Sequence, residues 1–237
     1  MRVDKKSLQT QMNENPFLHL EDVIYQNLRN EIIGLRIAPD SKLNESKMAD
    51  DLGVSRTPIR NALQRLEEEG LVHKASNRVP VVSRLTKNAC YQIMDARLAV
   101  EGHAAFLAAS QITEEELEEL KIWINRYQKA SRGKKPADIL EHSICDHHFH
   151  ALIIQASRNQ LIQEMYQKIE GRIFYYRNYL YHTLKPEDLQ RILAGAVRQH
   201  MTTYHALRLG FAEMAQAAVE ADARSMVGAF MVWDELK

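Results

Sequence analysis

Hydrophobic residues recur at helical spacing near the start of the chain. Between residues 20 and 35 an apolar side chain follows every fourth position, at Ile24, Leu28 and Ile32, which predicts a first helix. A shorter apolar run over 45–52 predicts a second helix, with Asn44 placed to cap its first turn and Gly53 to end it. A glycine turn joins this second helix to a third. Two helices connected in this way are typical of a helix-turn-helix.

The third helix is predicted from about Arg56 to Glu69. Ser55 is expected to cap it with its hydroxyl, Pro58 is tolerated in its first turn, and Gly70 ends it. Its apolar positions follow the spacing of a buried stripe: Ile59, Ala62, Leu63 and Leu66. The opposite face is polar and includes residue types that read bases and hold phosphates: Arg56, Thr57, Arg60, Asn61 and Gln64.

After Gly70 the pattern changes to two short β-prone runs in LVHKASNRVPVVS, with a turn at Asn77-Arg78. This predicts a hairpin, in which Pro80 must occupy a position that needs no ladder hydrogen bond. From Val54 to Arg84 there are six basic and three acidic residues. A helical hairpin that only packs against another element would explain the apolar stripe. It would not explain two arginines one turn apart followed by a basic hairpin.

The run LNESKMADDLGVSRTPIRNALQRLEEEGLV resembles the winged-helix signature of GntR-type bacterial transcription regulators. The resemblance implies binding to double-stranded operator DNA. Ser46 stands where FadR-like members often have an arginine, and Val79 replaces a glycine that is common at the wing tip. These two departures affect the base preference and the contact between the wing and DNA. The residues expected to contact DNA are Ser46, Ser55, Arg56, Thr57, Arg60, Asn61, Gln64 and Arg78.

Beyond Leu85 the apolar positions predict only helices, over 87–110, 113–130, 136–157, 160–182, 186–209 and 211–235. Leu161, Met165, Ile169 and Ile173 are one of the recurring apolar stripes. The expected fold is mainly α: an N-terminal winged helix-turn-helix with a small β hairpin, followed by an all-α six-helix bundle. The expected divisions are a disordered tail over 1–17, a DNA-binding domain over 18–84, and an effector-binding and dimerisation domain over 85–237.

Asp146 and His150 are four residues apart on a predicted helix, so a carboxylate and an imidazole can share one cation. His142 lies one turn earlier and is either a support for these residues or an ordinary histidine. Three stretches resemble the FCD ligand-binding domain of FadR-branch regulators: IMDARLAVEGHAAFLAA, DHHFHALIIQASRNQLIQEM and HMTTYHALRLG. This resemblance implies a metal site that adds His200 and a third histidine.

Asp222 stands where the FCD pattern has that third histidine. A carboxylate can still bind a metal, and a set of Asp146, His150, His200 and Asp222 suits Zn, Ni or Mn. In the alternative, Asp222 is a solvated surface charge and the metal site is lost. The resemblance also implies a small effector, often a carboxylate, near arginines of the bundle. Arg97, Arg172 and Tyr175 are the candidates, with Arg177 nearby, unless the arginines only pair with Glu101 or Glu170.

Composition changes this picture little. The formal net charge is zero, so only the local charge around the third helix indicates DNA. The two cysteines, Cys90 and Cys145, predict neither a disulfide framework nor a thiolate metal site, and neither a membrane span nor a signal peptide is predicted. We therefore expect a cytoplasmic protein.

The function expected from these features is that of a ligand-responsive regulator that binds a palindromic operator as a homodimer. The alternative is a metal-dependent hydrolase or lyase that uses the Asp and His cluster. That alternative lacks an identifiable nucleophile and gives no role to the polar face of the third helix. A third hypothesis, an interaction module without a DNA role, leaves the same face unexplained.

Overall fold

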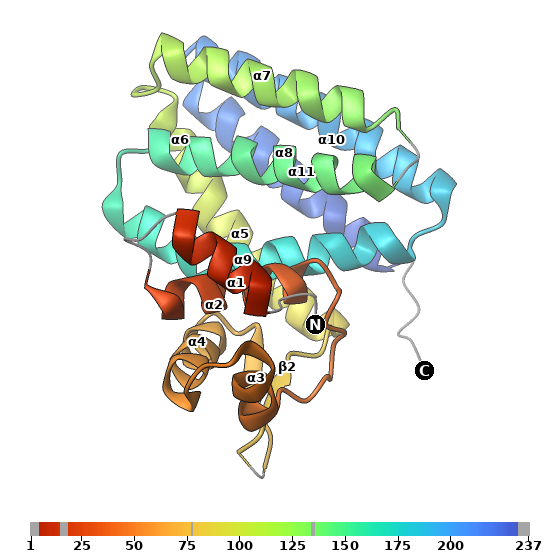
Figure 1. Cartoon of the computed structure of the whole chain (residues 1–237). Coiled ribbons are helices and arrows are strands. Elements are labelled where there is room, and N and C mark those ends of the chain that lie inside the picture. Colours follow the sequence, from red (N-terminus) through yellow and green to blue (C-terminus); the bar gives the residue numbers. More distant parts are fainter. Residues whose placement is uncertain (1–4, 15–18, 77, 134–135, 232–237) are drawn as a thin grey trace. The chain divides into compact units, whose positions relative to one another are not determined.

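The computed structural model describes residues 5–14, 19–76, 78–133 and 136–231. The chain forms two compact units, Met1–Leu85 and Thr86–Lys237. Figure 1 labels the helices and strands of both units. Among the described residues, no helix combines the length and the apolar character needed to cross a membrane.

The described residues of the first unit form four helices and one hairpin, which agrees with the predicted winged helix-turn-helix. Its elements are α1 (Lys5–Glu14), α2 (Leu20–Ile33), α3 (Glu45–Leu52), α4 (Arg56–Glu68), β1 (Val72–Lys74) and β2 (Pro80–Val82). The predicted stripes of α2, α3 and α4 meet in one core, with Leu28, Ile32, Leu52, Ile59 and Leu66 almost inaccessible to solvent. The burial of these stripes supplies the main stabilising term of the unit.

The strands β1 and β2 pair antiparallel, with Val72 opposite Val82 and Lys74 opposite Pro80. Pro80 begins its strand, and its carbonyl accepts a hydrogen bond from Leu43 N at 2.8 Å. The proline therefore contributes an acceptor where it cannot contribute a donor. Asn77, one of the two predicted turn residues, lies outside the described residues, and Arg78 has a positive φ of 61°.

Two sequence expectations for this unit are corrected. Within the tail predicted to be disordered, α1 covers Lys5–Glu14 and buries Leu8, whose exposed fraction is 3%. The polar composition of this segment does not predict that one apolar side chain is buried. Ser55 has the extended backbone of an N-cap but its side chain makes no capping hydrogen bond. Asn44, by contrast, caps α3 as predicted, since its side chain accepts from Lys47 N at 3.0 Å.

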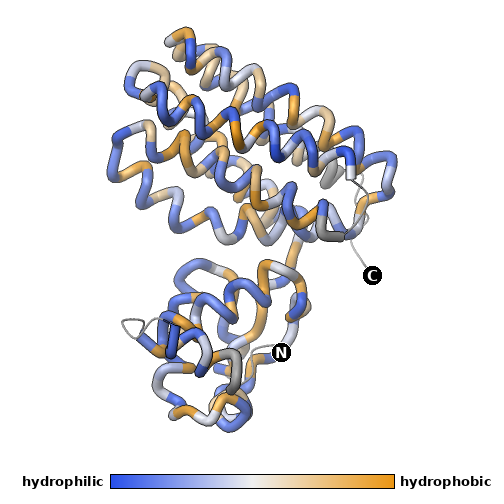
Figure 2. The backbone as a smooth tube through the Cα atoms, turned by 45° about the horizontal axis from the view of Figure 1, so that its top comes forward, coloured by the Kyte–Doolittle hydropathy of each residue, from blue (hydrophilic) through white to orange (hydrophobic). Residues whose placement is uncertain are grey.

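The second unit is an all-α bundle, as predicted. Its elements are α5 (Lys87–Arg97), the π-helical turn η1 (Leu98–Gly102), α6 (His103–Ala108), α7 (Glu114–Ala130), α8 (Pro136–Ala156), α9 (Gln160–Thr183), α10 (Pro186–Arg208) and α11 (Ala212–Met231). Helix α10 packs along α11, and α7 packs along α8. Figure 2 shows hydrophobic and hydrophilic positions alternating along these helices, as expected for elements that bury one face.

The first predicted helix of the bundle is interrupted by η1, a π-helical turn. Such turns are rare and occur frequently at functional sites. Here the turn follows Arg97 directly and contains Glu101. A second difference concerns the stripe predicted on α9: Ile169 and Ile173 are buried, but Leu161 and Met165 are 66% and 57% exposed. The stripe prediction was therefore wrong for the first two turns of α9.

Candidate functional site

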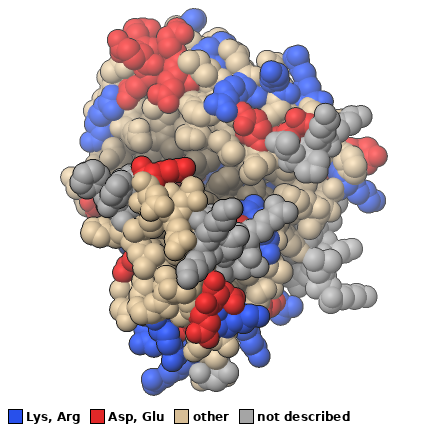
Figure 3. Space-filling model, viewed as in Figure 1, with Lys and Arg blue, Asp and Glu red and all other residues tan. Residues whose placement is uncertain are grey.

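The polar face of α4 and the hairpin form one surface of the first unit. Ser46, Arg56 and Arg78 line a groove of about 490 Å³ together with Lys42, Asn44 and Glu45. Ser55, Thr57, Arg60 and Gln64 are exposed, and Asn61 is half-buried. Figure 3 shows lysine and arginine side chains gathered at the end of the molecule where Figure 1 labels α3, α4 and β2. The residues expected to contact DNA thus share a basic surface.

Several of these side chains are held by acidic neighbours of the same unit. Arg60 donates to Glu45 Oε2 from Nε at 3.3 Å and from Nη2 at 3.2 Å, and the Arg60 side chain is still 63% exposed. Asn61 donates to Glu21 at 2.7 Å, and Gln64 donates to Glu68 at 3.4 Å. The exposed contacts of Arg60 and Gln64 are worth at most about 1 kcal/mol each, so these two side chains can exchange them for other partners, whereas the Asn61–Glu21 hydrogen bond is partly buried.

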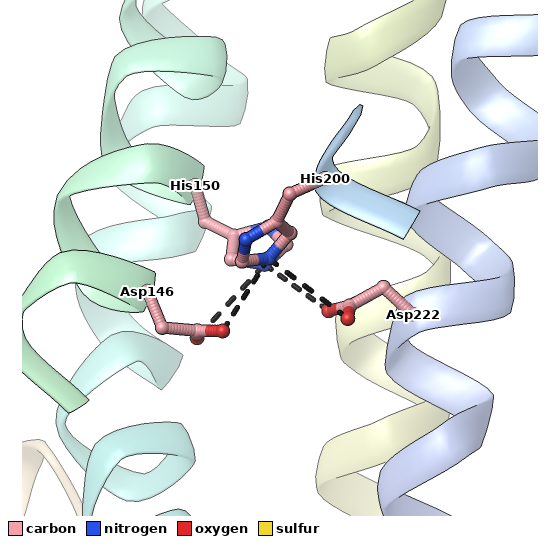
Figure 4. Close-up of side chains that lie close together, drawn as sticks. All are labelled: Asp146, His150, His200 and Asp222. Carbon is pink, nitrogen blue, oxygen red and sulfur yellow. Dashed lines mark ion pairs between the residues drawn. The ribbon is translucent and has the colours of Figure 1, made fainter. Parts of the chain in front are cut away.

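The second unit brings together the four predicted metal ligands, Asp146, His150, His200 and Asp222. One ligand atom from each lies within 4.8 Å of the others, and all four side chains are buried. Asp146 and His150 come from α8, His200 from α10 and Asp222 from α11, and Figure 4 shows the two imidazoles between the two carboxylates. Because Asp222 is only 4% exposed, the alternative that it is a solvated surface charge is wrong.

The contacts inside the cluster join each imidazole to both carboxylates. His150 Nε2 lies 3.2 Å from Asp222 Oδ2 and 3.9 Å from Asp146 Oδ2. His200 Nε2 lies 3.4 Å from Asp146 Oδ1 and 3.9 Å from Asp222 Oδ1. These distances are close to those between neighbouring ligands of one metal ion, whose bonds are about 2.0–2.2 Å long.

Two buried arginines and a third carboxylate surround the cluster. Arg97 donates to Glu101 at 2.8 Å and to Asp222 at 3.1 Å, and its Nη2 lies 2.9 Å from His150 Nε2. Arg177 donates to Asp146 and, at 3.1 Å, to the carbonyl of Ser143. The Arg97–Glu101 ion pair considered from the sequence is therefore present, but Arg97 also contacts the cluster. Together the three carboxylates and two guanidinium groups leave one negative charge in excess.

The electrostatics of the cluster favour a cation. Burial would raise the pKa of Asp146, but Arg177, His200 and His150 together outweigh it and hold this pKa well below its ordinary value. Burial would also raise the pKa of Asp222, which hydrogen bonding to His150 and the charges of His200 and Arg97 lower instead. Burial would lower the pKa of His150, but Glu101 raises it to about 9. Without a metal, a proton on His150 would therefore balance the single negative charge in excess.

The donor set fits a divalent metal. Both ring nitrogens of His200 are buried. Nδ1 has no hydrogen-bond partner among the described residues, and Nε2 faces the Asp146 carboxylate at 3.4 Å, so a metal could use a lone pair that is otherwise left unpaired. Imidazole nitrogens and carboxylate oxygens are ordinary ligands of Zn, Ni and Mn. A metal would be held by Asp146, His150, His200 and Asp222, and would supply a positive charge able to attract an anion.

The sequence identified some residues around the cluster and missed others. Arg97 lies at the cluster, as expected. Arg172 is half-buried and Tyr175 packs against Tyr176, and the arginine of α9 that reaches the cluster is Arg177 instead. Arg177 lies on the same helix face as Ile173 and Tyr181, one turn from each, and this common face could have distinguished it from Arg172.

His142 is also a member of this interior. It lies one turn before Asp146 on α8, is completely buried, and contacts Tyr127 with the two rings tilted and their centroids 3.6 Å apart. Burial lowers the pKa of His142 to about 3, so this imidazole is neutral. Both of its ring nitrogens lack a hydrogen-bond partner in the described part of the chain.

Comparison with known proteins assigns a family to each unit. Residues 20–81 match the family described as bacterial regulatory proteins, gntR family, and residues 92–224 match the FCD domain. The Glc operon transcriptional activator of Escherichia coli K12 is 28% identical, with 77% of each chain covered. The HTH-type transcriptional repressor RspR of the same strain is 27% identical over 85% of this chain and 84% of its own length.

Solved structures show the same fold. E. coli McbR/YncC superposes with a TM-score of 0.74 at 21% identity, over 91% of this chain and 99% of that one. A putative GntR regulator from Rhodococcus sp. RHA1 gives a TM-score of 0.70 at 19% identity, over 90% and 99%. The chain therefore belongs to the gntR family of bacterial regulatory proteins and is a transcription regulator with a C-terminal FCD domain.

Proposed function

We propose that this regulator binds an inverted-repeat operator as a homodimer and that a small anion, most simply a carboxylate, bound in the helical unit changes its affinity for DNA. The observation that carries the DNA part is the surface formed by α4 and the hairpin, where Arg56, Arg60 and Arg78 are exposed together. A single winged helix covers one half-site, so two copies are needed for the affinity that a regulator requires.

We propose that residues in the first turns of α4 read the bases, and that residues of the groove hold the sugar-phosphate backbone of the DNA. Arginine at such positions pairs with guanine edges, while asparagine and glutamine pair with adenine. Ser46, Ser55, Thr57 and Arg78 suit phosphate contacts, because hydroxyl and guanidinium groups donate to phosphate oxygens.

The anion class follows from the charge of the cluster. We propose that Asp146, His150, His200 and Asp222 hold Zn, Ni or Mn. The buried groups have one negative charge in excess, so a divalent ion together with neutral histidines would leave one positive charge. One carboxylate would neutralise it, and Arg97 and Arg177 are the guanidinium groups placed to orient its two oxygens. The family supports this role over metal-dependent hydrolysis, since its members are DNA-binding regulators.

Operator selection tests the DNA part. The purified protein is incubated with a genomic fragment library, and the bound fragments are sequenced. We expect a short inverted repeat that the wild type enriches and an Arg56→Ala, Arg60→Ala double variant does not, because the variant loses base and phosphate contacts of each half-site. Circular dichroism checks that the variant is folded. If the two proteins, both metal-loaded, enriched the same fragments, the proposed reading surface would be wrong.

Metal retention tests the cluster separately. His150→Ala and His200→Ala each remove one of four ligands, so we expect both variants to retain clearly less metal after purification than the wild type, measured by elemental mass spectrometry. His148→Ala serves as the matched control, because His148 lies on the same helix but is exposed. Equal metal content in the wild type and in both ligand variants would contradict the proposed site.

A further inference from the structure

A cavity of about 390 Å³ opens at one end of the bundle, where α7 gives way to α8 and α9 to α10. This end lies on the right in Figure 1. The wall of the cavity is mostly apolar and includes Ala130, Ile139, Leu184 and Leu193, with Tyr181 at its inner side. Two of its described lining residues, Asp138 and Glu187, are charged, and both are acidic.

The cavity is aligned with the metal cluster along three helical segments. On each of them the residue that lines the cavity is seven positions, or two helical turns, from a residue of the cluster or its arginine partner. These pairs are Ile139 and Asp146, Leu184 and Arg177, and Leu193 and His200. Seven residues of α-helix span about 10 Å and return to nearly the same face. Ile139 and Leu193 therefore lie about that distance along α8 and α10 from the cluster residues Asp146 and His200.

One layer of side chains separates the two. Tyr181, which lines the cavity, meets His142 edge to face with ring centroids 5.2 Å apart. The His142 ring contacts the Tyr127 ring in a tilted arrangement with centroids 3.6 Å apart, and Tyr127 meets His200 of the cluster edge to face at 4.7 Å. These three rings, at positions 127, 142 and 181, are called the aromatic layer below. Each of its rings lies one turn from the cavity, from the cluster, or from both.

Among the rings of this layer, His142 is the one whose nitrogen atoms could bind a metal. Its two ring nitrogens are buried and have no hydrogen-bond partner among the described residues. Leaving such groups unpaired costs about 1–3 kcal/mol each. An imidazole with a free lone pair is also the side chain that most often binds transition metals, and His142 lies one turn above Asp146 on the same face of α8.

We propose that the cavity is the entrance through which the metal reaches the cluster, and that His142 is a transient ligand between the two. The inference rests on the metal site proposed above. Asp138 and Glu187 concentrate cations at the mouth, Tyr181 closes the inner side, and His142 binds the ion while it passes from water to Asp146 and His200. The charges support a cation as the passing species, because Asp138 and Glu187 are the charged residues among those that line the cavity, and the cluster beyond it contains the carboxylates of Asp146 and Asp222.

The test measures metal exchange. Apo protein is mixed with Co²⁺, whose visible absorption reports coordination, and the loaded protein is then mixed with excess chelator. His142→Phe keeps a ring of similar size but removes both nitrogens. We expect uptake and release to slow by about the same factor, roughly tenfold, which corresponds to ~1.4 kcal/mol in the barrier. The final stoichiometry and affinity should equal those of the wild type, because His142 contacts the ion only in passage.

Two further variants make the test specific. His148→Phe, which changes an exposed ring of the same helix, should exchange metal at the wild-type rate. Asp138→Asn with Glu187→Gln should slow uptake at low ionic strength, and the difference should disappear at high ionic strength, where exposed charges are screened. Thermal unfolding of each apo variant confirms that it is folded.

The outcomes separate the two proposals. A wild-type protein that takes up no Co²⁺, Zn²⁺, Ni²⁺ or Mn²⁺ would overturn the metal site itself. A wild type that loads metal, together with a His142→Phe variant that loads and releases it at the same rate, would overturn only the relay. Loss of equilibrium binding in His142→Phe would also overturn it, since His142 would then be a permanent ligand or a structural residue.

Discussion

At the scale of single residues, His142 makes the stability of the metal-free protein depend on pH. Burial lowers its pKa to about 3 in the folded chain, with Arg177 and His200 acting in the same direction and Asp146 opposing them, against 6.5 for an ordinary histidine. Between these values the unfolded chain binds a proton that the folded chain does not. The free energy of unfolding therefore falls as the pH is lowered through this range.

His142→Phe should remove this contribution. When the pH falls from 7.5 to 5, we expect the free energy of unfolding of the variant to rise by about 2 kcal/mol relative to that of the wild type. Each pH unit below 6.5 corresponds to ~1.4 kcal/mol. Urea unfolding followed by tryptophan fluorescence measures it, because both tryptophans of the sequence lie beyond residue 86. Parallel pH profiles for the two apo proteins would show that His142 is not buried in neutral form.

The sequence predicted the four residues of the cluster and only part of its surroundings. Spacing on one helix places Asp146 and His150 together, and resemblance supplies His200 and Asp222. Whether Asp222 is buried depends on how α11 rotates against α10, which a helix of alanines and small side chains leaves undefined in sequence. Likewise, whether Arg172 or Arg177 reaches the cluster depends on the orientation of α9, and most faces of this helix are buried in the bundle.

At the scale of elements, α3 and α4 were predicted almost to the residue, because caps, a glycine turn and a clear apolar stripe coincide there. What the pattern does not reveal is the ion pair between Glu45 of α3 and Arg60 of α4. Glu45 holds the arginine in place and also sets a negative charge beside the DNA-binding surface. It should therefore disfavour DNA that does not offer Arg60 a better partner.

Glu45→Gln tests this role. We expect affinity for random-sequence DNA to rise by about threefold, in line with the 0.2–1 kcal/mol of an exposed ion pair and the loss of repulsion from phosphates. Affinity for the operator should rise less, so that discrimination falls. Fluorescence anisotropy at fixed salt measures both, with Glu67→Gln, which breaks the Lys74 ion pair, as the matched control. Equal changes for operator and random DNA would argue against a role in discrimination.

At the scale of the whole molecule, the proposed homodimer determines the geometry of the operator. Two winged helices related by a two-fold axis reach half-sites on the same face of the duplex only at certain spacings. Inserting ~5 base pairs between the half-sites turns one of them to the opposite face, whereas ~10 base pairs restore the face at a greater distance. We expect the shorter insertion to lower affinity by more than about tenfold, or ~1.4 kcal/mol.

The same geometry requires the protein to be dimeric at the concentrations used. Sedimentation at micromolar concentration should give twice the chain mass of 27.4 kDa. A monomer in solution that nevertheless distinguishes the two insertions would mean that the dimer assembles on DNA. A monomer that binds the original and the ~5 base-pair operators equally well would contradict the symmetric mode, since independent heads do not sense the angle between half-sites.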